Sequence, residues 1–473
     1  MARPQIDRAE ADAVLRELRR RTDEDDCENF HRYELDADHR LKNLFWADVD
    51  SRLDYASHGD VVVFDTTYRT NKYGAAFVPF LGLSRHRTPV IFGCGVLSDP
   101  SLDSYIWLLR TFMLSAAGQA RPRSLITDGG DAVAAAVRIV FPESSHRICS
   151  WHVERAADEH LFRGSPAARD AFMSLALDDA TCSPPAFEER WRGFVAAHGA
   201  AAANRRWLDA MHAKRELWAA AFARDGFFLG MASDQRTECL ATRLHAGLRE
   251  GMSLRDMVAH ADACARALRR DVAALDAEAD RSRVELATAH RGLEEHAARR
   301  FTPANFYLVR EEIVAVDGFE VVKTVARGHP MFGKKVYVVG LKQRWGVFFH
   351  VECSGGGDAV KCSCRKMERE GLPCRHIFCV MIHNNSSRIP DCCVLRRLRR
   401  REDTKAERID EMKDLGRQVF DLASEDAREF KEIKEFFEGW LEERRTGLRR
   451  SGAIAAHVDT VTPVTKKTKL IEN

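Results

Sequence analysis

The sequence predicts an α/β protein in which a mixed sheet is followed by a long all-helical insertion, a small β-rich region and C-terminal helices. Three observations predict this. Apolar, β-branched or aromatic runs separated by turn-like stretches begin at Asp60 and then alternate with helical spacing up to residue 152. Residues 153–300 are Ala-rich and helical in pattern, and strand-like runs return from Phe306. The 473 residues suffice for about two to four domains.

The elements of the expected sheet follow one another from Asp60. Three strand runs come first, then a helix that ends on Gly118, a short strand, a second helix and a last strand. The runs are DVVVFDTTY, AAFVPFLGLSRH, TPVIFGCGVL, SLDSYIWLLRTFMLSAAG, SLITD, AVAAAVRIVF and HRICSW. Upstream, residues 5–22 have the spacing of a polar amphipathic helix, which we expect to be a solvated arm rather than a contact helix.

The second half of the chain begins with the helical stretch. Its Trp191, Trp207 and Trp218 lie in amphipathic contexts, which favours core packing over ligand stacking. Four later runs are expected to be strands, and charged helices should follow from about residue 405 to 445, with a disordered tail. The four runs are FYLVREEIVAV, FEVVKTVA, KKVYVVGL and WGVFFHVEC.

Composition excludes some classes of function. The formal net charge of +2 does not indicate a nucleic-acid binder, so any such role must depend on local patches. The longest apolar run, near AAFVPFLGL, is about half of what a membrane helix needs, and the charged N-terminus is unlike a secretory signal. We therefore expect an intracellular, reducing compartment, in which the thirteen Cys are thiols or metal ligands.

Two expected strands end on an acid, Asp65 and Asp128. If these strands are neighbours, both carboxylates emerge at the same edge of the sheet, where they remain ionised together only with a cation between them. Mg2+ or Mn2+ suits oxygen ligands, and Glu238, at the start of a helix after the insertion, is our candidate third ligand. Such a site activates oxygens for phosphoryl transfer. Because a strand-end Asp often only caps a helix, spacing alone leaves both interpretations open.

The stretch VKCSCRKMEREGLPCRH predicts a second metal site. Its first two Cys follow a strand two residues apart and so face the same side, and a Gly-Leu-Pro turn can bring the last Cys and the His back to them. Four ligands within fifteen residues favour a closed, structural Zn2+ site over buried free thiols. The expected ligands are Cys362, Cys364, Cys374 and His376.

Two further features are less specific. Cys149 and His152 are two potential ligands that do not complete a site, and burial of Cys149 in the sheet is the simpler interpretation. Basic stretches could form an import signal, a phosphate-contacting patch or only a solvated helix face. They comprise Arg396, Arg397, Arg399, Arg400 and Arg401, and further on Lys466, Lys467 and Lys469.

Several motifs together carry a resemblance to a known family. LKNLFWADVDSRLDYASHGDVVVFDTTYRTNKYG, ITDGGDAVAAAVRIVFPESSHRICSWHV and the CxC…CxH run occur in this order. They resemble the plant far-red-impaired-response family, transcription regulators domesticated from Mutator-like transposases. The resemblance extends from about Leu41 to Arg400. It implies an RNase H-like core interrupted by a helical insertion.

The resemblance also implies roles for individual residues. Asp65 and Asp128 match the first two acids of the DDE triad, and Glu238, in RTEC, matches the third. Cys149 and His152 match the CxxH that such transposases carry between the second and third acids. The Cys and His of the second metal site match the SWIM zinc finger, and SSRIPDCCVLRRLRRRED resembles the stretch after that finger.

Pattern and resemblance together divide the chain into six parts. These are an N-terminal helical arm (1–40), the RNase H-like core with the first two acids (41–152), a helical insertion (153–235), a return helix with the third acid and a helical extension (236–300), a β-rich region with the SWIM zinc finger (301–390), and a basic segment with charged helices and a disordered tail (391–473).

The resemblance implies a nuclear, DNA-associated transcription regulator in light or developmental control rather than an enzyme. Full-length members carry an N-terminal zinc-chelating DNA-binding domain. No Cys/His cluster precedes Asp60 here, because Cys27 and His31 alone cannot build one. We therefore expect DNA contact directly or through homo- or hetero-oligomers with longer relatives, and no membrane partner. The alternatives are an active, metal-dependent Mutator-type transposase, since all three acids persist, and a truncated dimerisation partner.

Overall fold

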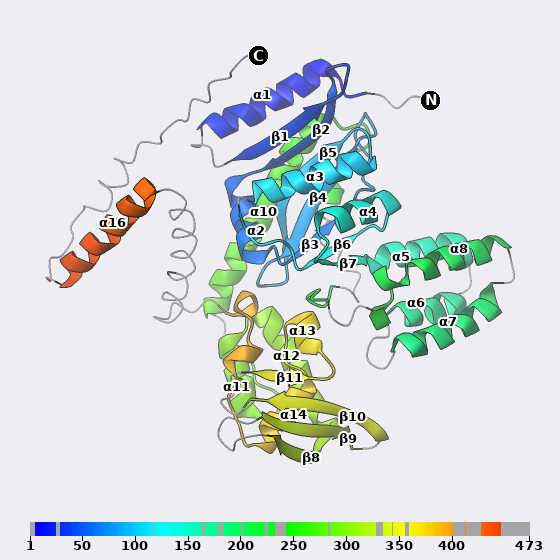
Figure 1. Ribbon diagram of the computed structural model, residues 1–473, viewed down its shortest axis with the longest axis vertical. Coiled ribbons are helices and arrows are strands. Elements are labelled where there is room, and N and C mark those ends of the chain that lie inside the picture. Colours follow the sequence, from blue (N-terminus) through cyan, green and yellow to red (C-terminus); the bar gives the residue numbers. More distant parts are fainter. Residues whose placement is uncertain are drawn as a thin grey trace. The chain divides into compact units, whose positions relative to one another are not determined.

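The computed structural model divides into two compact units, residues 1–401 and 402–473, which are considered separately (Figure 1). The structure describes residues 5–24, 29–116, 118–162, 166–177, 183–199, 202–222, 226–231, 243–281, 284–327, 334–342, 344–354, 359–400, 412 and 427–445.

A seven-stranded mixed sheet lies at the centre of the first unit, in the order β1-β2-β5-β4-β3-β6-β7. β3 pairs antiparallel with β4 and parallel with β6, and β6 pairs parallel with β7. The mixed sheet expected from the sequence is therefore present. Its strands are Phe30–Leu35, Leu41–Ala47, Val61–Phe64, Ala76–Leu83, Pro89–Leu97, Ser124–Thr127 and Ser145–Ile148.

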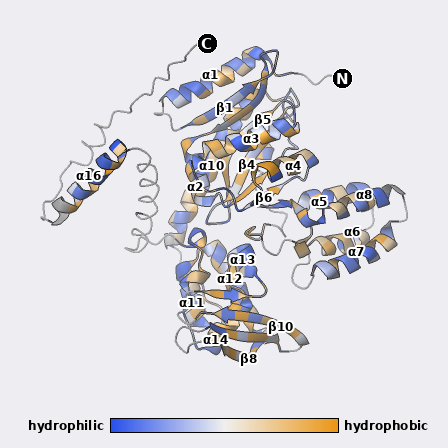
Figure 2. Cartoon of the chain, viewed as in Figure 1, coloured by the Kyte–Doolittle hydropathy of each residue, from blue (hydrophilic) through white to orange (hydrophobic). Residues whose placement is uncertain are grey.

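Both faces of this sheet are buried. In β3, Val61 and Val63 belong to one hydrophobic core, whereas Val62 and Phe64 belong to the other. Successive side chains of a strand point to opposite faces, so a strand covered on both sides reads as a continuous apolar run. Figure 2 shows the hydrophobic residues in the strands and the mixed stripes on the helices. The helices concerned are α1 (Arg8–Glu24), α2 (Val49–His58), α3 (Leu102–Ser115), α4 (Asp131–Val140) and α10 (Leu254–Arg281).

The expectation of a solvated N-terminal arm is wrong. Most apolar side chains of α1, and that of Ile6 two residues before it, are buried in one of the two cores. β1 and β2, which sequence analysis missed, extend the sheet. The apolar positions form a narrow stripe on a helix that is otherwise charged, and only the partner surface decides whether such a stripe is buried. The buried residues are Ile6, Ala11, Val14, Leu15 and Leu18.

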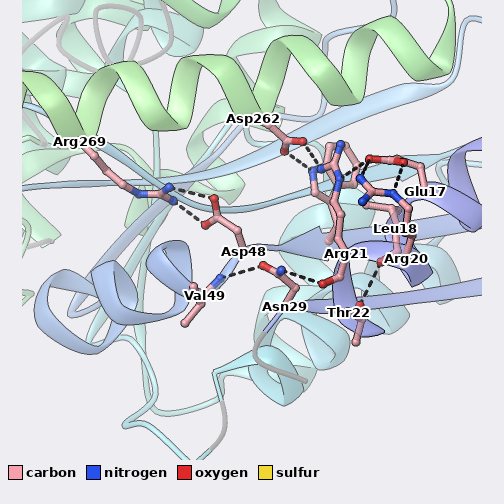
Figure 3. Close-up of polar contacts among 11 residues, drawn as sticks. Glu17, Leu18, Arg20, Arg21, Thr22, Asn29, Asp48, Val49, Asp262 and Arg269 are labelled. Carbon is pink, nitrogen blue, oxygen red and sulfur yellow. Dashed lines mark hydrogen bonds and ion pairs between the residues drawn. The ribbon is translucent and has the colours of Figure 1, made fainter. Parts of the chain in front are cut away.

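Charged contacts from α10 join the N-terminal elements to the sheet. Asp262 accepts hydrogen bonds from Arg21 Nη1 at 2.5 Å and from Trp46 Nε1 at 3.1 Å. Arg269 contacts Asp48, which caps α2, with its Nη2 2.6 Å from Oδ1. Figure 3 shows Asp262 reaching toward Arg21 and Arg269 reaching toward Asp48. A helix distant in sequence thus fixes the edge of the sheet.

The helical insertion has a separate core. Trp191 and Trp218 are buried in it and Trp207 packs against it, as predicted, and the ring of Phe172 stacks on that of Trp218 at 5.3 Å. The helices that surround these rings are α5 (Ser150–Ala157), α6 (Pro166–Leu177), α7 (Pro184–His198) and α8 (Ala202–Ala213).

A four-stranded antiparallel sheet, in the order β11-β10-β9-β8, organises the Cys-rich region. Three of the four runs predicted as strands match it. Its strands are Phe319–Arg327, Lys334–Leu341, Arg344–Cys353 and Val360–Cys362, and the helices around it are α11 (Arg291–Arg300), α12 (Pro303–Val314), α13 (Lys366–Glu370) and α14 (Arg375–His383).

The first of those four runs was predicted incorrectly as a strand. FYLVREEIVAV lies mainly in helix α12, which begins with Pro303 at its first turn. Phe306, Val309 and Ile313 are fully buried at helical spacing. Phe, Tyr, Val and Ile also favour strands, so composition misled the prediction where spacing and the early Pro indicated a helix.

In the second unit, helix α16 (Ala427–Arg445) matches part of the predicted charged helices. Ion pairs four residues apart, such as Lys431 with Glu435, lie along it. The predicted helix from residue 405 to 426, the tail and its three Lys lie outside the described residues, Met412 apart. Within the described ranges, no helix is both long and apolar enough to cross a membrane.

Candidate functional site

The first two predicted acids lie at the same edge of the large sheet. The parallel register pairs Val63 of β3 with Ile126 of β6, and its continuation by two residues sets Asp65 beside Asp128. Adjacent strands are about 4.8 Å apart. Both acids line one cavity of about 20 Å³, which is enough for one water molecule or ion. The other polar or aromatic residues that line it are Phe64, Tyr68, Thr127, Cys149, Trp151 and His152.

Backbone and hydroxyl donors hold each carboxylate. The amide and hydroxyl of Thr67 donate to Asp65 Oδ1 at 2.8 and 2.6 Å. Asp128 accepts from the Thr66 amide at 2.9 Å and from the Gly130 amide at 3.1 Å. Sequence analysis missed both Thr, although they directly follow the first acid. The donors to Asp65 favour the ionised carboxylate that a cation would need.

Asp128 does not cap the helix that follows it. The residue at the N-cap of α4 is Gly130, without a side-chain cap hydrogen bond. Gly129 has a φ of +84°, and a Cβ there would lie 2.7 Å from the side chain of Ile148. Glycine therefore allows the chain to turn sharply and leaves Asp128 at the edge. The helix-cap interpretation of this acid is thus wrong.

Cys149 and His152 lie at the same edge. Cys149 is buried immediately before α5, and His152 Nε2 is 3.3 Å from Asp65 Oδ2. Burial lowers the pKa of His152, but Asp65 and Cys149 raise it to about 10. The same pair contributes to the pKa of Asp65: burial raises it, and His152 with Thr67 lowers it below its usual value. The CxxH pair therefore lies beside Asp65 at the acid edge.

The third predicted acid, Glu238, lies outside the described residues, so its place in the triad stays a prediction. Shortly after it in the sequence, His245 packs on Tyr68 with ring centroids 3.9 Å apart. Burial lowers the pKa of His245, and Asp65 raises it. The described chain after residue 242 therefore reaches the acid edge. His245 carried no motif that sequence analysis could have used.

Two histidines near this edge are expected to have pKa values shifted in opposite directions. His152 should remain an imidazolium up to a pH of about 10, whereas burial lowers the pKa of His146, on β7, to about 4. Because the pKa of His152 lies above its usual 6.5, its charge stabilises the fold fully below pH 6.5, and this contribution is lost as the pH rises through about 10. NMR titration of the two rings from pH 5 to 10 measures this. Deprotonation of His152 near pH 6.5 would contradict the pairing with Asp65.

The four predicted zinc ligands lie together. The ligand atoms of Cys362, Cys364, Cys374 and His376 are all within 4.8 Å of one another. A tetrahedral Zn2+ with Zn–S bonds of about 2.3 Å separates its sulfurs by roughly 3.8 Å, so the set fits the ion. Hydrogen bonds among the thiols lower the pKa of Cys364 and raise that of Cys362. Zn2+ would act structurally here, as a clamp on the loop.

Neighbouring elements orient this cluster. Cys362 ends β11, and Cys374 directly precedes α14, on whose first turn His376 lies. The ring of His376 stacks on Phe349 with centroids 3.8 Å apart. Arg375 binds Glu312 of α12 through its Nε and Nη2 at 3.0 and 2.8 Å. The ligands are thus held by two sheet strands and two helices.

The predicted basic patch is largely structural. The side chain of Arg397 is only 8% exposed and forms an ion pair with Asp60, and its Nη2 donates to Leu83 O at 2.5 Å. Arg399 donates to Val394 O and Arg400 to Ala298 O. The prediction of a nucleic-acid or import patch is therefore wrong for Arg397, whereas for the half-buried Arg399 and Arg400 it stays a prediction. Arg396 is exposed, and Arg401 lies outside the described residues.

Replacing Arg397 should distinguish a structural role of this side chain from a role in the nucleic-acid or import patch. Arg397→Met removes one partner of a nearly buried ion pair and is expected to lower the free energy of unfolding by about 3 kcal/mol. The exposed neighbour offers a matched control, and Arg396→Met should change it by less than about 0.5 kcal/mol. Urea denaturation measures both. If the two variants were equally stable, Arg397 would again be a candidate for the nucleic-acid or import patch.

Comparison with known proteins adds to this geometry. Residues 61–156 match the MULE transposase domain, and residues 349–385 match the SWIM zinc finger. The chain is a distant homologue of the FAR1-related sequence family. Protein FAR1-RELATED SEQUENCE 5 of Arabidopsis thaliana is 28% identical over 81% of this chain and 48% of its own length. Protein FAR1-RELATED SEQUENCE 4 is 27% identical over 83% and 52%, and Protein FAR-RED IMPAIRED RESPONSE 1 is 29% identical over 52% and 29%.

The chain spans about half the length of these two FAR1-RELATED SEQUENCE proteins. The MULE match contains Asp65, Asp128, Cys149 and His152, so both described acids and the CxxH pair belong to that domain. The SWIM match contains the complete Cys/His cluster. Two distinct candidate metal centres therefore coincide with two recognised domains.

Proposed function

We propose that this chain is a nuclear, zinc-binding, DNA-associated transcription regulator built on a transposase-derived scaffold. The observation that carries the proposal is the coexistence, in one compact unit, of the acid-bearing MULE sheet and the SWIM ligand cluster in a homologue of FAR1-related proteins. The name of one relative, FAR-RED IMPAIRED RESPONSE 1, refers to far-red light. We extend the proposal to light or developmental control on that basis.

An RNase H-like core is part of the proposal. Three consecutive antiparallel strands, β3 to β5, are followed by the parallel pairs of β6 and β7, and the helical insertion comes after the second acid in sequence. Mg2+ or Mn2+ at the acids would bridge the carboxylates to DNA phosphates, so this edge can contact DNA without cutting it. Longer relatives are the proposed protein partners.

Chromatin occupancy tests the regulator function. A tagged chain expressed in plant cells should enter the nucleus and enrich defined DNA sites, either alone or together with a co-purifying longer relative. Asp65→Asn should leave nuclear entry unchanged. Exclusion of the unmodified chain from the nucleus would refute the proposal.

Metal-dependent DNA cleavage is a second candidate function, favoured by the two carboxylates that line one cavity. In-line displacement on phosphate uses acids of this kind to hold a divalent cation, which would activate the attacking oxygen or stabilise the leaving one. The purified chain with Mn2+ and DNA that carries terminal inverted repeats would then nick the DNA, and Asp65→Asn would abolish nicking. If no metal supports cleavage, this candidate is rejected and the regulator proposal is untouched.

A further inference from the structure

A short apolar segment lies between the acid-bearing sheet and the SWIM finger. We call residues 226–231 the connector and residues 349–385 the finger. Within the connector, Leu229 and Gly230 have φ angles of +55° and +72°. A left-handed conformation is unfavourable for Leu, so surrounding contacts must hold this turn in place. The residues Phe227, Phe228, Leu229 and Met231 are each at most 3% exposed.

The finger holds one side of the connector. The amides of Phe228 and Leu229 both donate to the carbonyl of Arg369, at 2.9 and 3.0 Å. Arg369 lies in α13, within the loop that Cys364 and Cys374 close when they share an ion. The acceptor of two buried amides therefore belongs to a loop whose conformation depends on zinc.

The sheet holds the other side. The guanidinium of Arg147 lies 5.7 Å from the ring centroid of Phe228, and that of Arg123 lies 4.2 Å from that of Phe227. Arg147 is on β7, which leads through Cys149 to His152 and so to Asp65. A continuous series of contacts thus runs from the zinc loop through the connector to the acid edge.

Arg87 fixes the turn itself. Its Nη1 donates to Leu229 O at 2.8 Å and its Nε to Asn305 Oδ1 at 2.7 Å. The residue belongs to the β4–β5 turn of the large sheet, whereas Asn305 is on α12 beside the finger. One side chain therefore joins the sheet, the connector and the helix that supports the finger.

We propose that the connector, with Arg87 and Arg147 as positioning residues, couples zinc occupancy of the finger to the geometry of the acid edge. When the zinc loop unfolds, the Phe228 and Leu229 amides lose their common acceptor. Buried amides without a partner are costly, so the connector should leave its place. If the two sites are coupled in this way, zinc loss should also weaken the binding of a cation at Asp65 and Asp128. That last consequence depends on the proposed cation role of the acids.

Hydrogen exchange on the full zinc-loaded chain tests the connector. Removal of zinc by a chelator should speed exchange of the Phe228 and Leu229 amides at least tenfold, while β3 and β6 keep their protection. Unchanged protection of the connector beside an exchanging zinc loop would overturn the proposal. If zinc removal exposes β3 and β6 as well, the decision passes to a variant that keeps its zinc.

That variant is Arg87→Lys, which replaces the two donor nitrogens of Arg87, Nη1 toward Leu229 and Nε toward Asn305, by a single amine on a shorter side chain. With one zinc per chain still bound, it should speed connector exchange and weaken Mn2+ binding severalfold. Arg121→Lys is the matched control, because Arg121 also donates to a backbone carbonyl, that of Val140, but away from the connector. Connector exchange identical in the two variants would refute the proposal. If the connector exchanges faster but the unmodified chain binds no Mn2+, the cation role of the acids is rejected. The proposed dependence of the connector on the zinc loop is then kept.

Discussion

Cys374→Ala should reduce bound zinc from about one ion per chain to near zero, since three remaining ligands leave a structural tetrahedron open. Zinc contributes about 10–16 kcal/mol of apparent binding energy to small zinc folds, so the finger should lose its structure. Elemental analysis gives the stoichiometry, and limited proteolysis reports the melting of residues 349–385. The core on the other face of the large sheet, which includes Phe45, Phe80 and Phe112, contains no residue of the finger, so the sheet should persist.

Cys379→Ala is the matched control for this experiment. Cys379 is a buried thiol on helix α14, which begins directly after Cys374, and it lies outside the ligand cluster. Its replacement should leave the zinc content unchanged and cost only the packing of one small side chain. If both variants retained a full zinc ion, the cluster would be four ordinary core residues.

The second large effect is expected at the acid edge. Asp65→Asn should weaken Mn2+ binding by more than about 100-fold, because even a change behind a ligand typically costs 10- to 100-fold. Asp128→Asn should do the same, since the two carboxylates flank one cavity. Isothermal titration of the zinc-loaded chain with Mn2+ measures both affinities.

Asp131→Asn distinguishes a site from general negative charge. Asp131 is three residues after Asp128, in the first turn of α4, and its side chain is 99% exposed. Asp131→Asn removes one negative charge near the site, as Asp65→Asn does, but Asp131 does not line the cavity. The affinity for Mn2+ should therefore change less than about twofold. Equal losses in Asp131→Asn and Asp65→Asn would mean that the edge attracts cations without binding one.

The sequence was informative where the signal was local. Asp65 and Asp128 each end a short apolar run, and parallel pairing of those runs suffices to set them side by side. The zinc ligands are close in sequence, so a strand, a turn and a helix start determine their meeting. In both cases the position of the side chains follows from the geometry of adjacent strands or of residues close in sequence.

Other features depended on partners far along the chain. The stripe of α1 is buried only because α10 and the sheet cover it, and Arg397 is buried only because Asp60 lies opposite. The connector meets Arg369 across more than a hundred residues. The α12 error has another origin, because Phe306 and its neighbours favour strands by composition while their spacing is helical. Local propensity yields to tertiary context at such places.

Anomalous scattering from crystals soaked in Mn2+ tests the account most directly, because it locates both metals in one experiment. The account predicts a zinc peak amid Cys362, Cys364, Cys374 and His376, and a manganese peak between Asp65 and Asp128. A zinc peak with no manganese at the sheet edge, at Mn2+ concentrations that saturate other acid sites, would contradict it.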